Sequence, residues 1–151
     1  MVISLKIKMN LYPTEEKENL VKLFNFFFPF ETITTLEPDN SGVSEMSAEI
    51  QGNNALNFIY KQVRKQRTVE ALRHFILPRI IFNTNSCKFL IHKQALSMGK
   101  VVLCKTKAES PLGPVYLEYK ANKIEDVIEY LFPPTERGRV IEANYTPEDL
   151  D

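Results

Sequence analysis

The sequence lacks the features from which a membrane span or a disulfide scaffold is built. Its 151 residues contain no apolar run close to the roughly 20 residues that cross a bilayer. Residues 1–6 mix polar with apolar side chains and so lack the apolar centre of a signal peptide. Two cysteines are too few for a disulfide-dense secreted fold and suit a compartment in which thiols stay reduced. We therefore expect a cytoplasmic protein that does not associate with membranes.

The motifs of common cofactor and metal sites are also missing. There is no GxxxxGKS or GxxxxGKT loop for phosphates, no GxGxxG for dinucleotides, and neither CxxC nor HExxH for zinc. Nucleophilic chemistry by Cys87 or Cys104 with His92 stays open, but such residues on short apolar strands are more often packing residues. We predict buried, inert thiols, with a disulfide between them left open for a hyperthermophilic source. We expect no metal, no cofactor and no enzymatic activity.

What remains is the composition of an ordinary globular domain, with 44% hydrophobic and 25% charged residues. A chain of this length buries roughly 68–70% of its unfolded surface, so its core needs neither a metal nor a disulfide. We expect a single α+β domain over residues 1–134. Residues 135–151 are polar and acidic, which predicts a partly frayed tail.

Hydrophobic periodicity predicts the elements of this domain. Residues 3–9 alternate apolar with polar side chains, which indicates a half-buried strand. Apolar residues from Leu20 to Phe27 repeat at helical spacing after Pro13, and Pro29 is expected to end that helix. We predict further strands over 31–36, 45–50, 87–92, 101–104 and 115–120, further helices over 56–63, 69–76 and 124–131, and one helical turn over 94–98. The result is a mainly antiparallel sheet of about six strands, with three to four helices packed on it.

The formal net charge of zero hides an uneven distribution. Residues 1–52 carry four basic and eight acidic side chains, a net of minus four. Residues 53–105 carry ten basic side chains and one acidic, a net of plus nine, and residues 106–151 carry five and ten, a net of minus five. Because exposed charges act over only about 8 Å at physiological salt, a phosphate backbone on the central segment would meet a positive field.

The basic residues of the central segment form a stripe. Lys61, Arg64 and Lys65 stand three and four residues apart on one face of a predicted helix, and Arg67 follows. Arg73 belongs to the exposed side of the next helix. Such a stripe can pair with successive RNA phosphates. The alternative is a solvated helix face whose partners are carboxylates elsewhere in the fold.

The aromatic residues are assigned to the core. Phe24, Phe26, Phe27, Phe28 and Phe30 are interpreted as a packing cluster before a stacking platform. Tyr60 and Phe89 are better placed to contact a base, although core packing is the favoured interpretation for them too.

Two stretches of the sequence carry a family resemblance. Residues 89–101 read FLIHKQALSMGKV, and residues 109–115 read ESPLGPV. Together with Pro13-Thr14-Glu15, they resemble an archaeal family of small proteins described as RNA-binding. The resemblance implies a fold similar to that of ribosomal large-subunit protein five and a role beside archaeal RNA processing or the exosome. His92 departs from the family, in which asparagine is common at that position.

Three residues match the family within the basic segment, namely Lys93, Gln94 and Lys100. Lys93 can meet a phosphate and Gln94 a base edge or a sugar, while Gly99 can end the short helix in a left-handed conformation. The alternative is that Gln94 caps the turn and the Pro-Leu-Gly loop only fixes the return of the chain into the sheet.

We therefore predict a non-enzymatic RNA-binding protein. The candidate contacts are Lys61, Arg64, Lys65, Arg67, Arg73, Lys93, Gln94 and Lys100. The runner-up is an interaction or scaffold subunit of an RNA-processing assembly, whose basic face docks an acidic protein surface. A hydrolase with an unrecognised site is a distant third. The sequence leaves open whether the chain forms a homodimer and whether the RNA is single or double stranded.

Alanine at Lys61, Arg64 and Lys65 together is expected to weaken RNA binding. Contact of five side chains with single-stranded RNA gives a salt slope of roughly −3.5, which lowers affinity about a hundredfold between about 50 and 200 mM salt. The measurement is RNA affinity across a salt series for the wild type and the triple variant. An affinity independent of salt contradicts the hypothesis, and an unchanged affinity in the variant favours the interaction subunit.

Overall fold

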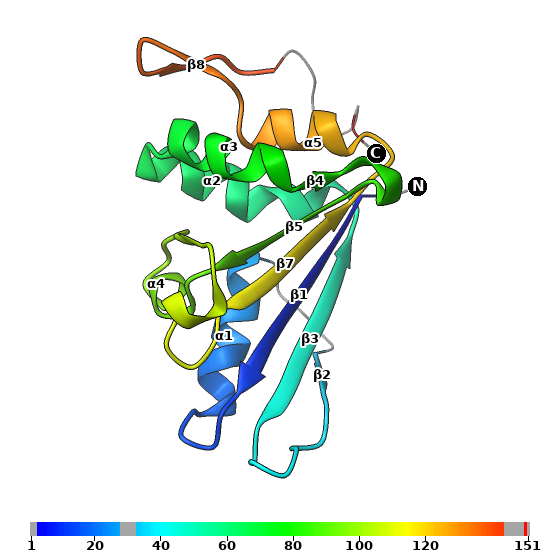
Figure 1. Ribbon diagram of the computed structural model, residues 1–151, viewed down its shortest axis with the longest axis vertical. Helices are drawn as coiled ribbons and strands as arrows, with labels where there is room; N and C mark the ends of the chain where they lie inside the picture. Colours follow the sequence, from blue (N-terminus) through cyan, green and yellow to red (C-terminus); the bar gives the residue numbers. More distant parts are fainter. Residues whose placement is uncertain (1–2, 28–32, 144–149, 151) are drawn as a thin grey trace.

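The computed structural model describes residues 3–27, 33–143 and 150, and in these ranges one large antiparallel sheet carries helices on one face (Figure 1). The strand order is β2-β3-β1-β7-β5-β4, and β6 also pairs with β5. The strands are β1 (Ser4–Leu11), β2 (Thr34–Thr35), β3 (Ser44–Gln51), β4 (Ile80–Ile81), β5 (Ser86–Ile91), β6 (Leu103–Cys104) and β7 (Val115–Lys120).

Helices cover the buried face of this sheet. Figure 1 shows α1 behind the strands, with α2, α3 and α5 gathered at their upper end. The α-helices of the described ranges are α1 (Lys17–Phe27), α2 (Asn57–Gln66), α3 (Val69–Ile76), α4 (Lys93–Ser97) and α5 (Ile124–Leu131). Short 3₁₀ helices lie at Asn53–Leu56, Leu77–Arg79, Phe82–Thr84 and Lys107–Glu109.

The central strand β1 determines which face of the sheet is dry. Ile7 pairs in register with Ala48 of β3 and with Leu117 of β7. Ile7 and its neighbours two residues away on β1 are fully buried, whereas Lys6 and Lys8 are exposed on the opposite face. Successive side chains of a strand point to opposite faces, so one face packs under the helices and the other faces water.

The predicted α+β class and mainly antiparallel sheet are confirmed. The helix expected after Pro13 begins at Lys17, because Tyr12 and Glu15 close a turn in which the Glu15 amide donates to the Tyr12 carbonyl at 2.9 Å. The strand expected over 101–104 shortens to Leu103–Cys104. The reason is that the Gln66 side chain bonds both main-chain polar groups of Val101, at 2.6 and 2.9 Å, and replaces a neighbouring strand.

Some expectations concern residues that the structure does not describe. Residues 28–32 are outside it, and with them lie Phe28 and Phe30 of the aromatic cluster and the helix end at Pro29. The strand predicted over 31–36 is described at Thr34–Thr35 alone.

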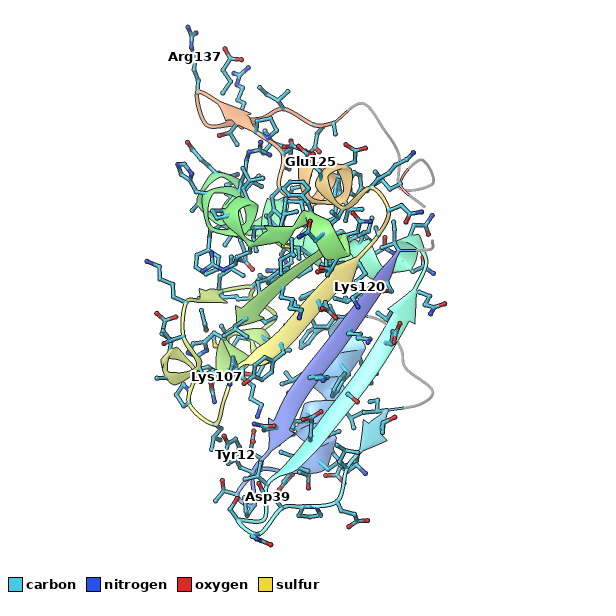
Figure 2. All side chains as sticks on the ribbon, turned by 45° about the vertical axis from the view of Figure 1, so that its right-hand side comes forward. Tyr12, Asp39, Lys107, Lys120, Glu125 and Arg137 are labelled. Atoms are coloured by element: carbon cyan, nitrogen blue, oxygen red, sulfur yellow. The ribbon has the colours of Figure 1, made fainter. Side chains whose placement is uncertain are left out.

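A hairpin follows the domain where the tail was expected to begin. It consists of β8 (Thr135–Glu136) and β9 (Arg139–Val140), and its tip is Arg137 and Gly138, with φ of 51° and 77°. Two successive left-handed residues are what a tight two-residue hairpin turn requires. Figure 2 shows Arg137 at one extremity of the molecule. Residues 144–149 and 151 of the tail lie outside the described ranges.

Adjacent residues of β1 should respond very differently to truncation. Ile7→Ala is expected to lower the free energy of unfolding by about 2–5 kcal/mol, because Ile7 is 0% exposed and its loss leaves a cavity. Lys6→Ala on the same strand should change it by less than about 0.5 kcal/mol. Urea unfolding of both variants measures the difference, and equal losses would contradict the described orientation of β1.

Candidate functional site

Arg64, a predicted RNA contact, is occupied by internal partners. Its guanidinium donates to the carbonyls of Tyr130 and Leu131 at 2.9 and 3.0 Å, and to both carboxylate oxygens of Glu142 at 2.7 and 2.8 Å. It also lies 3.6 Å from the centroid of the Tyr60 ring. Because the last carbonyls of a helix have no partner within the helix, Arg64 stabilises the end of α5 and ties it to α2.

Arg73 of α3 also binds the end of α5. Its guanidinium forms two hydrogen bonds with the Glu129 carboxylate, at 2.9 and 2.8 Å, and a third with the Phe132 carbonyl at 2.8 Å. Arg64 and Arg73 thus hold three successive carbonyls at the end of α5 between them. Planar guanidinium groups suit such forked contacts.

Lys93 is buried, with 3% of its side chain exposed. Its ammonium donates to the carbonyls of Asn10 and Leu112, at 2.6 and 3.0 Å, and to the Glu15 carboxylate at 2.9 Å. Burial lowers the pKa of Lys93 from its ordinary value, and the hydrogen bond and charge of Glu15 act against that shift. Lys93 therefore joins the end of β1 to the loop before β7.

The two stretches that carry the family resemblance contact each other. Gln94 donates to the Pro111 carbonyl at 2.7 Å, and the Ser110 hydroxyl donates to the Gly113 carbonyl at 2.9 Å and accepts from the Lys93 amide at 3.0 Å. These contacts fit the alternative in which this region fixes the path of the chain.

His92 caps the helix that these contacts position. The Ala95 amide donates to His92 Nδ1 at 3.2 Å, so His92 is the N-cap of α4. Asparagine is also a favoured N-cap, so the departure from the family pattern at this position leaves the capping role intact.

The other four candidates are exposed, and two of them line the same hollow. Lys65 of α2 and Lys100 after α4 line a hollow of about 470 Å³ whose apolar walls are Phe26, Phe58 and Met98. Lys61 is exposed on α2, and Arg67 ends that helix in a left-handed conformation with φ 57°. We call the hollow between α1, α2 and α4 the helix groove.

A second basic surface, which the sequence analysis missed, lies on the exposed sheet face. Cα partners in the sheet place Lys88, Glu118, Lys6 and Glu49 in one row across β5, β7, β1 and β3. Lys88 pairs with Glu118 at 3.3 Å, and Lys120 approaches the same carboxylate at 4.0 Å. Figure 2 shows Lys107 beside the start of β7 and Lys120 at its end. Opposite charges alternate along the row, but cations accumulate beside β5.

A hollow of about 430 Å³ opens on this face. Its charged lining is five cations and one carboxylate, namely Lys6, Lys8, Arg79, Lys88, Lys105 and Glu118. Tyr116 and Leu90 are among its uncharged lining. We call it the sheet-face hollow.

Not all of these cations are free. The Arg79 guanidinium donates to the Phe75 carbonyl and lies 3.5 Å from the centroid of the Phe75 ring. The Lys8 ammonium is 4.0 Å from the Glu45 carboxylate. Among the described residues, no carboxylate lies within 4.0 Å of the ammonium of Lys6 or Lys105. The sheet-face hollow therefore keeps an excess of positive charge after its internal ion pairs are taken into account.

The thiols are reduced and buried, as predicted. Cys87 and Cys104 are free, and burial raises the pKa of Cys87 to about 12. Burial also raises the pKa of Cys104, and the charge of Glu109 adds to this shift. Protonated thiols are poor nucleophiles and metal ligands.

Within the described ranges, no group of three His, Cys, Asp or Glu residues could hold a metal ion. None of the helices in these ranges has both the length and the apolar character of a membrane span.

Comparison with known proteins identifies relatives across nearly the entire sequence. The chain is 26% identical to a UPF0201 protein of Sulfurisphaera tokodaii over 144 residues, covering 95% of this chain and 96% of that protein. Identity to a UPF0201 protein of Metallosphaera sedula is 28% over 143 residues, with the same coverage. No family model matches the sequence.

Solved structures of similar proteins also match this chain in fold. The crystal structure of a UPF0201 protein from Methanococcus jannaschii matches with a TM-score of 0.76 and 25% identity, covering 92% of this chain and 99% of that one. In sequence and in fold, the chain is similar to the archaeal UPF0201 family. A DUF54 protein from Methanothermobacter thermautotrophicus shares the fold, with a TM-score of 0.61, 15% identity and coverage of 85% and 95%. The likeness to an archaeal family is confirmed, while RNA binding and a fold like ribosomal protein five stay predictions.

Removal of the buried lysine should be costly. Lys93→Met is expected to lower the free energy of unfolding by about 3–5 kcal/mol, because it leaves the Glu15 carboxylate without its cationic partner at a site where that side chain is 12% exposed. Lys100→Ala, a nearby exposed lysine, should cost less than about 0.5 kcal/mol.

Urea unfolding of both variants makes the comparison. Adding Glu15→Gln to Lys93→Met should recover part of the loss, because the stranded charge is then gone. Equal stability of Lys93→Met and the wild type would show that the ion pair contributes nothing.

Proposed function

We propose that the protein binds RNA through the exposed sheet face and catalyses no reaction. The observation that supports this most is the sheet-face hollow, whose charged lining is five cations and one carboxylate around a tyrosine ring. Lysine and arginine side chains contact phosphate oxygens, and aromatic side chains stack on unpaired bases. The same small area therefore offers both kinds of contact that an RNA strand uses.

The local excess of positive charge makes this surface a better candidate than the net charge suggests. Over the whole chain the formal charge is zero, but charges separated by more than about 8 Å are largely screened at physiological salt. Lys6, Lys88 and Lys105 stand together although they belong to three different strands or their ends. We expect moderate affinity, since Glu49 and Glu45 of β3 lie beside Lys6 and Lys8 and limit indiscriminate binding.

The predicted contacts on α2 and beyond it fall into two groups under this proposal. Lys61, Lys65, Arg67 and Lys100 are exposed but do not line the sheet-face hollow, so the proposal assigns them no phosphate contact. Arg64, Arg73, Lys93 and Gln94 contribute through the fold, because internal acceptors occupy their donors. The sequence resemblance supports a role beside archaeal RNA processing or the exosome and a fold like ribosomal protein five. The low cysteine content supports a cytoplasmic location.

One observation favours the second candidate, an interaction or scaffold subunit. The helix groove exposes apolar side chains, with Phe26 39% and Met98 73% exposed, and its charged residues are Lys65 and Lys100. Methionine and phenylalanine surfaces adapt to apolar side chains of a partner, and the two lysines favour an acidic one. An RNA-processing assembly offers such partners, and a second copy of the chain is the homodimer alternative.

Two matched double variants distinguish these surfaces. Lys88→Ala with Lys105→Ala is expected to lower the salt slope of RNA binding by about 1.4, since each lost phosphate contact removes about 0.7 for a single strand. Lys61→Ala with Lys65→Ala, which removes the same charge from α2, should leave the slope within about 0.3 of the wild type. Arg64 is excluded from this pair because its loss would disturb the end of α5.

The measurement is the affinity for an unstructured oligouridylate across a salt series. A reversed result, with the slope lost in the α2 variant alone, would move the interface to α2. No salt-dependent binding in the wild type would reject RNA binding and favour the scaffold subunit.

A further inference from the structure

The floor of the sheet-face hollow is uncharged. In the register of the sheet, Tyr116 lies between Lys8 and Leu90, and Leu90 pairs with Cys104 on its other side. Tyr116 and Leu90 are half-buried, and the residues before and after each are buried in the core, so both point to the exposed face. An aromatic ring and an aliphatic side chain therefore stand next to each other among cations.

The ring of Tyr116 has no stacking partner among the described residues. Its ring contact is with Lys107, whose ammonium lies 5.7 Å from the ring centroid, near the outer limit of about 6 Å for a cation–π interaction. Other tyrosines are committed to the fold. Tyr119 is buried and donates to the Ala55 carbonyl at 3.0 Å, and Tyr60 stacks on Tyr130 at 4.7 Å between centroids. Tyr116 is thus the tyrosine of the sheet whose face is open to a ligand.

The size and charge of the hollow suit a small anionic group. Its volume of about 430 Å³ lies toward the lower end of ligand sites, which measure about 300–1,000 Å³. A hollow of that volume accommodates one nucleotide and is too small for a segment of double-helical RNA. Lys88 and Lys105 line the hollow on the side of β5 and β6, and Lys6 and Lys8 line it on β1. This charge complements phosphates on either side of a base held over Tyr116.

We propose that the sheet-face hollow takes one unpaired nucleotide of a single-stranded RNA, with its base stacked on Tyr116 and its phosphates against Lys88 and Lys105. This inference rests on RNA binding by the exposed sheet face and adds the kind of RNA that is bound. A base inside a duplex is stacked on its neighbours and cannot reach a ring in a hollow, whereas an unpaired base can.

Substitution of the ring tests the inference directly. Tyr116→Leu keeps an apolar side chain and removes the flat ring, so it should weaken oligouridylate binding at least about fivefold, the lower end of what one stacked base contributes. Tyr116→Phe keeps the ring and should stay within about twofold of the wild type. The salt slope should not change in either variant, because no phosphate contact is lost. A duplex RNA hairpin of equal length and inorganic polyphosphate serve as the competing probes.

The outcomes separate this inference from RNA binding as such. Wild-type affinity in Tyr116→Leu, equal affinity for the duplex, or polyphosphate competing as well as the oligouridylate would each overturn the single-strand site. If Lys88→Ala with Lys105→Ala still lowered the salt slope, RNA binding by the exposed sheet face would stand without it. A wild-type protein that binds neither RNA in a salt-dependent manner would overturn both.

Discussion

The structure depends on one constraint, which is that its sheet is covered on one face only. β1 lies at the centre of that sheet and satisfies the constraint residue by residue, with Ile7 under the helices and Lys6 in water. Antiparallel sheets tolerate this one-sided burial, because alternate side chains face opposite ways. The core on one side and the basic surface on the other are therefore two outcomes of the same alternation.

The cations of the chain divide according to that constraint. On the helical side, Arg64 and Arg73 donate to carbonyls at the end of α5, and Lys93 donates to a carbonyl at the end of β1. An unpaired charge at such places would cost several kcal/mol, so these contacts are obligatory once the residues are there. On the open side of the sheet, water solvates the lysines at little cost, and they remain available to a ligand.

Much of the fold follows from local patterns, because burial imposes its own period on the sequence. The alternation in β1 and β7, and the spacing of Leu20, Leu23 and Phe24 in α1, record which side of each element is buried. The irregular parts depend on distant partners instead. No local pattern indicates that Gln66 would bond Val101 and shorten a strand, or that Tyr12 and Glu15 would delay the start of α1.

The candidate site was harder to predict for a related reason. Counting charge along the chain assigned Lys6 and Lys8 to an acidic segment, whereas antiparallel pairing places them on one side of β7 and Lys88 on the other, around the same hollow. Helical spacing correctly placed Lys61, Arg64 and Lys65 on one helix, but it could not show that Arg64 also binds residues 66 to 78 positions away. The available signal for Lys6, Lys8 and Tyr116 was the alternation of these residues with buried ones along their strands. That signal could be used only once the order of the strands in the sheet was known.

The hairpin after α5 has a consequence for the integrity of the chain. Its tip carries Arg137 and Arg139 on either side of Gly138, and all three are exposed. Exposed tips of this kind are where proteases first cut a folded protein. A trypsin-like enzyme would cleave the backbone at this tip. The two pieces would still be held together, because Arg64 before the cut binds Glu142 after it and β8 pairs with β9 across it. The protein could therefore be nicked and still migrate as one particle, with its two pieces parting only when unfolded.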